Sequence, residues 1–484
     1  MFTLLFMFCA HAFCYANLSF SGASVMVDVS RGSASLTADG QFLATLYWRV
    51  RGALSAPLLV GLISTVCLAA SAVLIADLLG LAHAVSLAAL CGTLTLHISV
   101  TAINASMLHM ADAYFLALLF AVAGAWLCAR HPLGFLPAAG FFAACLGMQQ
   151  SFFAVAPALL ALAGLCAVLR GDAPRKTLLL ILRSALSLAA GFAVYLIGAM
   201  LFCRRQGADL NAGWQMAYGS GLLDAYLAPL RSMMIEATAY PSLCAFLFGL
   251  ICALALLGAL FCLRGLGAGR IALGAVLLCA LPLIIAMPVF APEGRIASSE
   301  TYALGMLPVA AIALLDHLYA GLTGRARVLL PRLIAGAFGV TFLSSIVFAN
   351  QVYLKKTLEY QSTLSVMTRV VDAAEHTEGF NPGYTPVAMI GTLEDSPLAA
   401  GHEGFEHLRV LDAAANRFTA STQDQNTWYF WEILGYPLNF VSDVERDALL
   451  GSKQVAAMPV FPAEGSTAMI DGTLVIKLSQ PSSK

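Results

Sequence analysis

The sequence has 484 residues, of which 60% are hydrophobic and only 11% are charged, and its formal net charge is −1. A soluble domain carries about 25% charged residues and about 45–50% apolar ones. This composition therefore disfavours a soluble enzyme, a coiled coil, a disordered chain and a nucleic-acid-binding protein.

The charge is distributed unevenly along the chain. Residues 1–350 contain 17 basic and 11 acidic side chains, whereas the last 134 residues contain 9 basic and 16 acidic ones. The first part is thus 8% charged and the second part 19% charged. We predict a polytopic, all-α membrane domain over 1–350, followed by a water-soluble domain over 351–484.

Apolar segments long enough to cross a bilayer recur through the first part of the chain. A spanning helix needs about 20 mostly apolar residues, and about eleven segments meet or nearly meet that length. They are 2–20, 55–80, 84–103, 113–129, 133–148, 151–169, 184–203, 242–263, 271–291, 302–320 and 333–350. The 133–148 segment is short, and only Gln149 and Gln150 separate it from the next, so a tight hairpin inside the membrane is an alternative there.

Lysine and arginine in short loops mark the cytoplasmic side of a membrane protein. The loops that we place in the cytoplasm are short and poor in acids, and they contain Arg130, Arg170, Arg175, Lys176, Arg264, Arg270, Arg325, Arg327 and Arg332. The opposite loops, 21–54, 104–112, 204–241 and 292–301, carry both signs of charge. Eleven spans would leave the N-terminus in the cytoplasm and the tail outside. We expect the first segment to be an uncleaved helix, because no basic residue precedes Arg31 as a signal peptide would require.

Two outer stretches and the tail show further patterns. Residues 40–52 and 204–241 mix tyrosine, tryptophan and apolar residues, which predicts helices lying at the membrane surface. The tail begins with a helical pattern over 351–376, continues with strand-like segments at 386–391 and 407–411, and has a helical segment at 426–434. Asp471-Gly472 between apolar runs predicts a hairpin. These patterns indicate a small α/β domain.

One acid in the first outer loop is the candidate for chemistry. Asp39 immediately precedes the predicted surface helix, where a carboxylate can act as a general base toward a hydroxyl group. The alternative is that Asp39-Gly40 forms a turn and caps the following helix. Asp28 is a rival acid in the same loop. Asp112 is another, and a solvated helix end would explain it equally well.

Three arginines lie on the side where the positive-inside rule disfavours them. Arg204, Arg205 and Arg295 would gain a role from a lipid phosphate, because guanidinium groups bind phosphate in bidentate geometry. Neutralisation by neighbouring acids is the alternative. The twelve cysteines form no metal-ligand spacing, and no phosphate loop is present, so we expect no metal and no cofactor.

The sequence resembles the Gtr-type, serotype-converting O-antigen glucosyltransferases of bacteria. The resemblance rests on the acid in the first outer loop, about eleven spans, the hairpin motif LGMQQ at 146–150 and the outer tail. It is most specific in the last part of that tail, MPVFPAEGS at 458–466 and MIDGTLVIKL at 469–478. The present sequence departs from this family at two positions. The family has paired acids in the first loop, whereas Gly40 follows Asp39 here, and it has an aromatic residue at the position of Met148.

The resemblance implies a GT-C-like enzyme of the bacterial inner membrane with a periplasmic C-terminal domain. It would transfer a sugar, typically glucose, from a polyprenyl-phosphate donor to a glycan acceptor, inverting the anomeric centre. Asp39, or else Asp28 or Asp112, would be the general base, and the three arginines would bind the donor phosphate. Contacts to the sugars are expected from Gln149, Gln150, Trp214 and Trp428. Partners would be membrane lipids, a companion donor synthase and a flippase, and no nucleic acid.

Other functions remain alternatives at the level of the sequence. A lipid-linked glycan flippase would need charges inside several spans and should lack the long outer tail. An O-antigen polymerase or ligase usually has one dominant outer loop. A membrane sensor with the tail as its binding module would not depend on Asp39.

Overall fold

The computed structural model describes residues 1–17, 28, 33–207, 239–285, 298–398, 408, 418–419 and 423–480. The chain divides into two compact units. The membrane unit contains residues 1–16, 29–104 and 108–351, and the C-terminal unit contains residues 17–28, 105–107 and 352–484.

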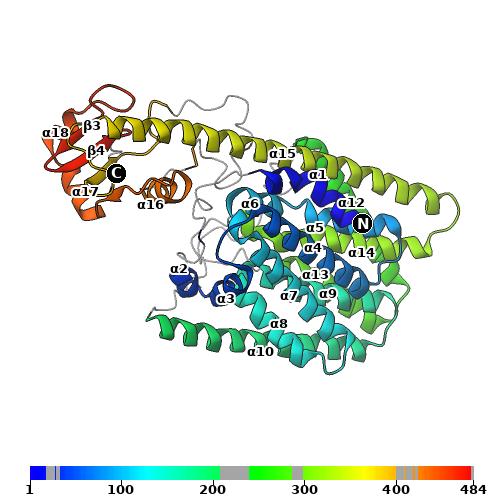
Figure 1. Ribbon diagram of the computed structural model, residues 1–484. Coiled ribbons are helices and arrows are strands. Elements are labelled where there is room, and N and C mark those ends of the chain that lie inside the picture. The colour runs from blue at the N-terminus through cyan, green and yellow to red at the C-terminus, as the bar shows by residue number, and fades with distance from the viewer. Residues whose placement is uncertain are drawn as a thin grey trace. The chain divides into compact units, whose positions relative to one another are not determined.

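The membrane unit is built from helices alone in its described part (Figure 1). In chain order they are α1 (Phe2–Ala16), α2 (Ser33–Ala38), α3 (Phe42–Arg51), α4 (Pro57–Leu79), α5 (Ala84–Thr95), α6 (Ile98–Ser106), η3 (Leu108–Met110), α7 (Ala111–Arg130), α8 (Phe135–Met148), η4 (Gln150–Ala154), α9 (Val155–Leu169), α10 (Pro174–Gln206), α12 (Pro241–Arg264), α13 (Ala268–Ile285), η7 (Ser298–Gly305), α14 (Met306–Gly321) and α15 (Ala326–Glu375). Three of the long helices begin with a proline, Pro57, Pro174 or Pro241. Proline suits a first turn, where its missing N–H would have no helical partner.

Nine helical stretches in the described part of the chain are long and apolar enough to cross a membrane. Two more apolar helices, α1 and α8, are shorter, with 15 and 14 residues. The prediction of a mostly helical membrane protein is thus confirmed, whereas the multi-pass topology and the count of about eleven spans stay predictions. The predicted 84–103 segment forms two helices, α5 and α6, and the Nδ1 atom of His97 accepts the Ser99 N–H at 3.2 Å between them.

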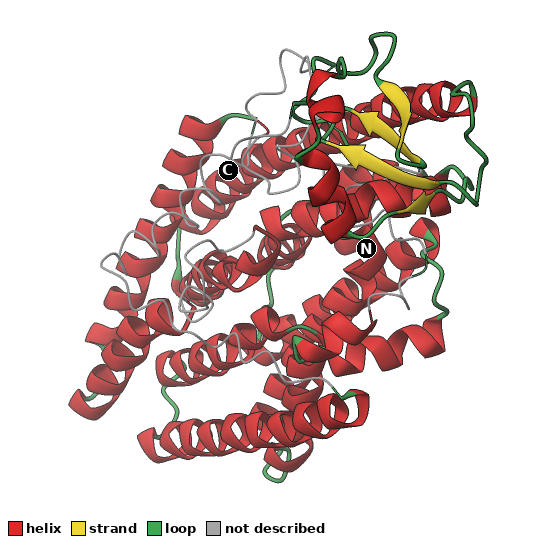
Figure 2. Ribbon diagram, turned by 90° about the vertical axis from the view of Figure 1, so that its left-hand side faces the viewer, coloured by secondary structure: helices red, strands yellow, loops and turns green. Residues whose placement is uncertain are grey.

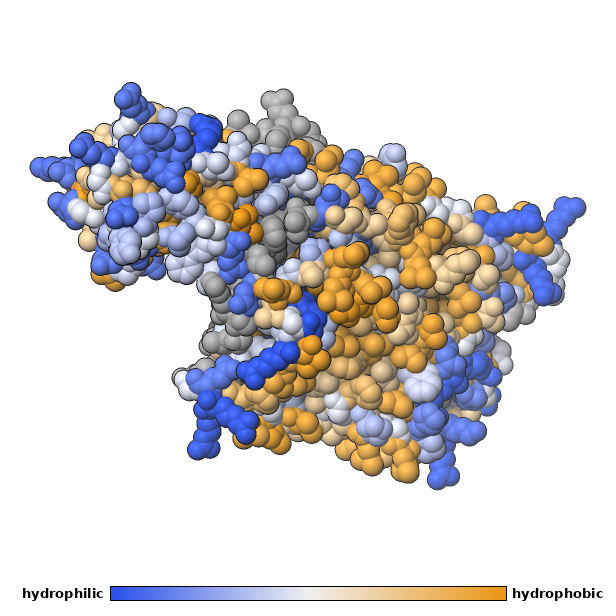
Figure 3. Space-filling model, viewed as in Figure 1, coloured by the Kyte–Doolittle hydropathy of each residue, from blue (hydrophilic) through white to orange (hydrophobic). Residues whose placement is uncertain are grey.

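Burial separates central helices from peripheral ones. Helix α9 packs against α4, α7, α10, α13 and α14, and all its residues except Pro157 are buried. Helices α10, α12 and α13 leave much of their apolar surface uncovered. The hydrophobic surface over the membrane helices in Figure 3 is the kind of surface that lipid chains cover.

The C-terminal unit packs helices around a small sheet (Figure 2). Its strands are β1 (Pro386–Ile390), β2 (Asn439–Phe440), β3 (Thr467–Ile470) and β4 (Thr473–Lys477), in the order β2-β1-β4-β3. Strand β1 pairs in parallel with β2 and β4, and β3 pairs antiparallel with β4. Its other elements are the end of α15, α16 (Gln423–Trp428), the π-helix η10 (Tyr429–Ile433), α17 (Asp443–Leu450) and α18 (Lys453–Ala457).

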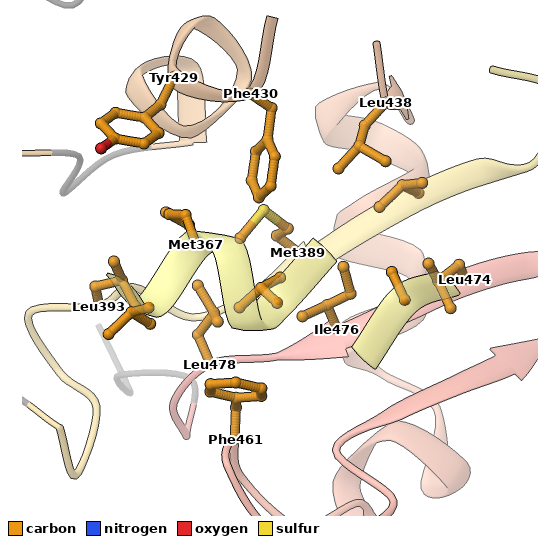
Figure 4. Close-up of a cluster of buried hydrophobic side chains, with 14 of the residues drawn as sticks. Met367, Met389, Leu393, Tyr429, Phe430, Leu438, Phe461, Leu474, Ile476 and Leu478 are labelled. Atoms are coloured by element: carbon orange, nitrogen blue, oxygen red, sulfur yellow. The ribbon is translucent and has the colours of Figure 1, made fainter. Parts of the chain in front are cut away.

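One face of this sheet packs on the last turns of α15 and on η10 (Figure 4). Met367 from the helix, Met389 and Ile476 from the strands, and Phe430 from η10 lie in the same buried cluster. Each of these side chains is at most 1% exposed. The cluster gives the C-terminal unit a hydrophobic core of its own.

The structure bears out most of the secondary structure expected for the tail. Strand β1 forms within the predicted segment 386–391, and α16 with η10 covers most of 426–434. Asp471 and Gly472 both have positive φ, at 49° and 78°, as the predicted two-residue hairpin requires. The 407–411 segment lies outside the described residues except for Leu408. Helix α15 runs without a break from the last predicted span into the predicted tail helix.

Candidate functional site

The turn that carries Asp39 joins the short helices α2 and α3. The N–H of Gln41 donates to the carbonyl of Leu36 at 2.8 Å, and the N–H of Gly40 donates to that of Thr37 at 3.0 Å. With Gly40 at φ +81°, these bonds form a Schellman motif that ends α2. The turn expected at Asp39-Gly40 is therefore present, but Asp39 does not cap the following helix, because the N-cap of α3 is Gln41. Asp39 itself is exposed.

The two glutamines between α8 and η4 contact this turn. The Nε2 atom of Gln150 donates to the backbone carbonyl of Asp39 at 2.7 Å and to the hydroxyl of Tyr195 at 3.0 Å. The Nε2 atom of Gln41 donates to Oε1 of Gln149 at 2.8 Å. Polar side chains beside apolar helices need protein or water partners. The amides of Gln149 and Gln150 therefore have partners on the segment that carries Asp39.

Close packing reinforces these hydrogen bonds. A Cβ atom at Gly40 would clash with the Tyr195 hydroxyl and lie 2.9 Å from Nε2 of Gln150, and the positive φ would strain it as well. Phe42, at the start of α3, stacks on the Tyr195 ring with the centroids 6.2 Å apart. The buried cluster behind this contact contains Phe42, Ala143, Leu146, Tyr195 and Ala199. The turn is thus seated on α8 and α10.

The other end of α3 is anchored on Asp112, the third residue considered as a general base. Nη1 of Arg51 lies 3.0 Å and 2.9 Å from the two carboxylate oxygens of Asp112, and the Tyr47 hydroxyl donates to Oδ2 at 2.8 Å. The Ala113 N–H donates to Oδ1 at 3.0 Å. The side chains of Arg51 and Asp112 are only 2% and 0% exposed. The alternative of a solvated helix end is therefore wrong for Asp112.

Tyr47 serves this ion pair as a neutral donor. Burial, together with the charge of Asp112, raises the pKa of Tyr47 far above its usual range. The phenol therefore keeps its proton at any physiological pH and can donate it to the carboxylate. Asp112 accordingly is buried, with hydrogen-bond donors on both carboxylate oxygens.

The structure brings together only part of the predicted site. Residues 33–51 contain Asp39 and contact Gln149, Gln150 and Asp112. Arg204 and Arg205 are exposed in the last turn of α10, the helix that also carries Tyr195. Arg295 and Trp214 lie outside the described residues.

Two of the predicted residues belong to the C-terminal unit instead. The N–H of Asp28 donates to Oε2 of Glu432 at 3.0 Å. Trp428 packs against the core of this unit and meets Trp431 edge to face, with the ring centroids 6.1 Å apart. Trp431 is 42% exposed, and its Nε1 atom donates to the Leu438 carbonyl at 2.8 Å.

Tyr47, Arg51 and Tyr195 are among the residues of this arrangement that the sequence did not single out. Tyr47 and Arg51 are four positions apart on a predicted surface helix, and Arg51 is a further basic residue in a predicted outer loop. Both signals could have suggested a buried partner for Arg51. Tyr195 gave no signal, because a tyrosine within an apolar span is unremarkable. In the described parts of the chain, no three His, Cys, Asp or Glu side chains are grouped as metal ligands would be.

The fold and this site define a helical membrane protein with an exposed acid on a turn docked against its helices. The model of a known family, described as "Glucosyl transferase GtrII", matches residues 32–312, more than half of the chain. The chain belongs to this family, which confirms the resemblance and makes the protein a membrane glycosyltransferase. No curated protein matches the chain. The matched range includes Asp39 and Asp112 but neither Asp28 nor Trp428.

Proposed function

We propose that the protein transfers glucose from a polyprenyl-phosphate donor to a glycan such as O-antigen at the periplasmic face of the bacterial inner membrane. Asp39 would act as the general base. The family supports glucosyl transfer, and the membrane unit supports a donor that is itself a lipid. The orientation of the loops supports the periplasmic face.

The choice of Asp39 as the base rests on how Asp39, Asp112 and Asp28 differ in exposure and position. Asp39 is exposed, so an acceptor hydroxyl can approach its carboxylate. Asp112 is 0% exposed and ion-paired with Arg51, so an acceptor hydroxyl cannot reach its carboxylate. Asp28 lies outside the range that matches the family model and belongs to the C-terminal unit. Asp39 therefore fits the role best.

The proposed step is a single inverting displacement. The acceptor hydroxyl oxygen attacks the anomeric carbon of the donor glucose as the carboxylate of Asp39 takes its proton. The bond from the anomeric carbon to the phosphate oxygen breaks, and its electron pair leaves with the phosphate. The products are the glucosylated acceptor, with an inverted anomeric centre, and polyprenyl phosphate. Positioned proton transfer of this kind contributes about 10²–10⁴-fold to the rate.

The developing charge on the leaving phosphate needs cationic partners. Arg204 and Arg205 at the end of α10 are exposed. Both arginines and Arg295 belong to the range that matches the family model. We assign the phosphate to Arg295 together with Arg204 or Arg205, since guanidinium groups stabilise such charge without a metal ion. The C-terminal unit, with Trp428, would shape the choice of acceptor by offering aromatic surface to sugars.

The test replaces Asp39 in the full-length enzyme. We expect Asp39→Asn to lose about 10²-fold or more of the transfer rate while inserting and purifying like the wild type. Asp372→Asn is the matched control, because Asp372 is exposed on the C-terminal part of α15 and should leave activity unchanged. Transfer is measured with a synthetic polyprenyl-phosphate glucose and by glycan mass spectrometry of cells with and without the gene.

Two results would contradict the proposal in different ways. More than about a tenth of wild-type activity in Asp39→Asn would exclude this residue as the general base, since that role is worth far more. A glycan mass unchanged by the gene, with an altered distribution of the lipid-linked sugar, would favour a flippase instead. A gain of one hexose per glycan repeat supports glucosyl transfer.

A further inference from the structure

We infer that Gln150, with Tyr195, is a positioning residue that sets the catalytic carboxylate through the backbone of Asp39 and does not bind a sugar. The inference rests on the proposed function, because it assigns these residues to the general base of that reaction. It also replaces the sugar-binding role that the sequence suggested for Gln150. The geometry of three neighbouring groups carries it.

The amide nitrogen of Gln150 has no hydrogen left for a ligand. A glutamine amide has two N–H hydrogens, and Nε2 of Gln150 donates to the Asp39 carbonyl at 2.7 Å and to the Tyr195 hydroxyl at 3.0 Å. Gln149 is no better placed for a sugar, because it is 3% exposed and its Oε1 accepts from Gln41. The amide nitrogen of Gln150 and the amide oxygen of Gln149 therefore both bond the protein itself.

The hydrogen bond from Gln150 to Asp39 is important for the place at which it is made. Gln150 bonds the carbonyl of the very residue that carries the carboxylate, at the end of α2. Tyr195 is 1% exposed, stacked against Phe42 and fixed on the long helix α10. The Gln150 amide thus links the acid to a rigid helix.

The fold does not depend on this link. The Schellman bonds close the turn by themselves, and the contact of Arg51 with Asp112 fixes the far end of α3. Loss of the Gln150 amide should therefore leave the turn formed but free to shift. A displacement of about 1 Å in a reacting group can cost about 10²-fold in rate.

The experiment compares Gln150→Ala and Gln150→Glu in the full-length enzyme. The glutamate has nearly the same shape but cannot donate to the Asp39 carbonyl. For both variants we expect kcat to fall about 10–100-fold. The KM for donor and acceptor should stay within about 3-fold of the wild type, because KM need not change when only transition-state interactions are lost. Gln361→Ala, an exposed glutamine on α15, is the matched control and should leave both parameters unchanged. Tyr195→Phe should lower kcat less, since Gln150 keeps its bond to Asp39.

A double-mutant cycle with Asp39→Asn tests whether Gln150 acts through the base. Once the base is absent, we expect Gln150→Ala to cost little further activity, so the two losses will not multiply. Multiplying losses, or a KM raised about as much as kcat falls, would overturn the inference in favour of sugar contact. An unchanged kcat in both Gln150 variants would overturn it too. If the Asp39→Asn single variant is active, Asp39 is not the general base and the proposed function fails. That failure is seen in Asp39→Asn by itself, without any Gln150 variant, so the two failures are distinguishable.

Discussion

The ion pair of Arg51 and Asp112 should be the main anchor of the helix that follows Asp39. Nη1 of Arg51 lies within 3.0 Å of both carboxylate oxygens, and the two side chains are 2% and 0% exposed. Asp112→Ala leaves the guanidinium buried without its counter-charge. Removal of one partner from a buried pair costs about 3–5 kcal/mol, which corresponds to a factor of more than about 10² in the docking equilibrium.

The control replaces both partners by apolar residues. Arg51→Met combined with Asp112→Leu leaves no uncompensated charge, and such replacements are often close to neutral. We therefore expect the double variant to recover most of the stability that Asp112→Ala loses. Asp112→Asn should lie between the two, because its amide keeps an acceptor for Tyr47.

Two measurements detect the undocking of α2 and α3. The first is the apparent melting temperature in detergent at a fixed scan rate, which should fall in Asp112→Ala and recover in the double variant. The second is labelling of Cys203, which is 2% exposed and whose thiol donates to the Thr37 carbonyl at 3.2 Å. Labelling by a maleimide, followed at this cysteine by mass spectrometry, should be faster in Asp112→Ala.

The reasoning is refuted if Asp112→Ala melts like the wild type and keeps Cys203 protected. A different pattern, with stability unchanged and transfer abolished in Asp112→Asn, would instead make Asp112 the general base. The two roles therefore give opposite results when stability and transfer are both measured on the Asp112 variants.

Three further predictions concern the turn, the C-terminal unit and the topology. Gly40→Ala should lower transfer at least as much as Gln150→Ala, because its Cβ would clash with the Tyr195 hydroxyl; wild-type kinetics in this variant would contradict the docked geometry. Lys477→Met should destabilise the C-terminal unit by about 1–3 kcal/mol, because the buried Lys477 Nζ donates to the carbonyls of Val455, Ala456 and Met458 at 3.0, 3.1 and 2.9 Å. Proteolysis of the full-length protein checks this, since cleavage of the tail at the wild-type rate would argue against it. Alkaline phosphatase fused after Lys484 should be active, whereas fluorescence of green fluorescent protein at that site would place the tail in the cytoplasm.

Elements with a strong local signal were predictable. A run of about 20 apolar residues has few alternatives to a membrane helix, and the Asp471-Gly472 pair between apolar runs has few alternatives to a hairpin. The boundaries were less predictable where tertiary contacts set them. One apolar segment divides into α5 and α6, and the N–H of Ser99 donates to the His97 ring where α6 begins, a side-chain contact that hydropathy does not encode.

The candidate site was predictable as a set of residue types but not as an arrangement. Asp39, Gln149, Gln150 and Asp112 were each noticed because a polar side chain is conspicuous beside an apolar segment. Nothing in the sequence indicated that Gln150 would bond the backbone of Asp39, since more than one hundred residues separate them. Arg51 was overlooked because its partner, Asp112, lies in another loop.

The sequence by itself determined that the protein is a membrane protein with many helices and an acid in its first long loop, because hydropathy and charge act locally along the chain. The tertiary structure alone decided which acid is exposed and which is buried against an arginine. That distinction depends on burial and on the nearest charges in space: Asp112 has Arg51 within 3.0 Å, whereas Asp39 reaches the surface on a turn held by Gln150.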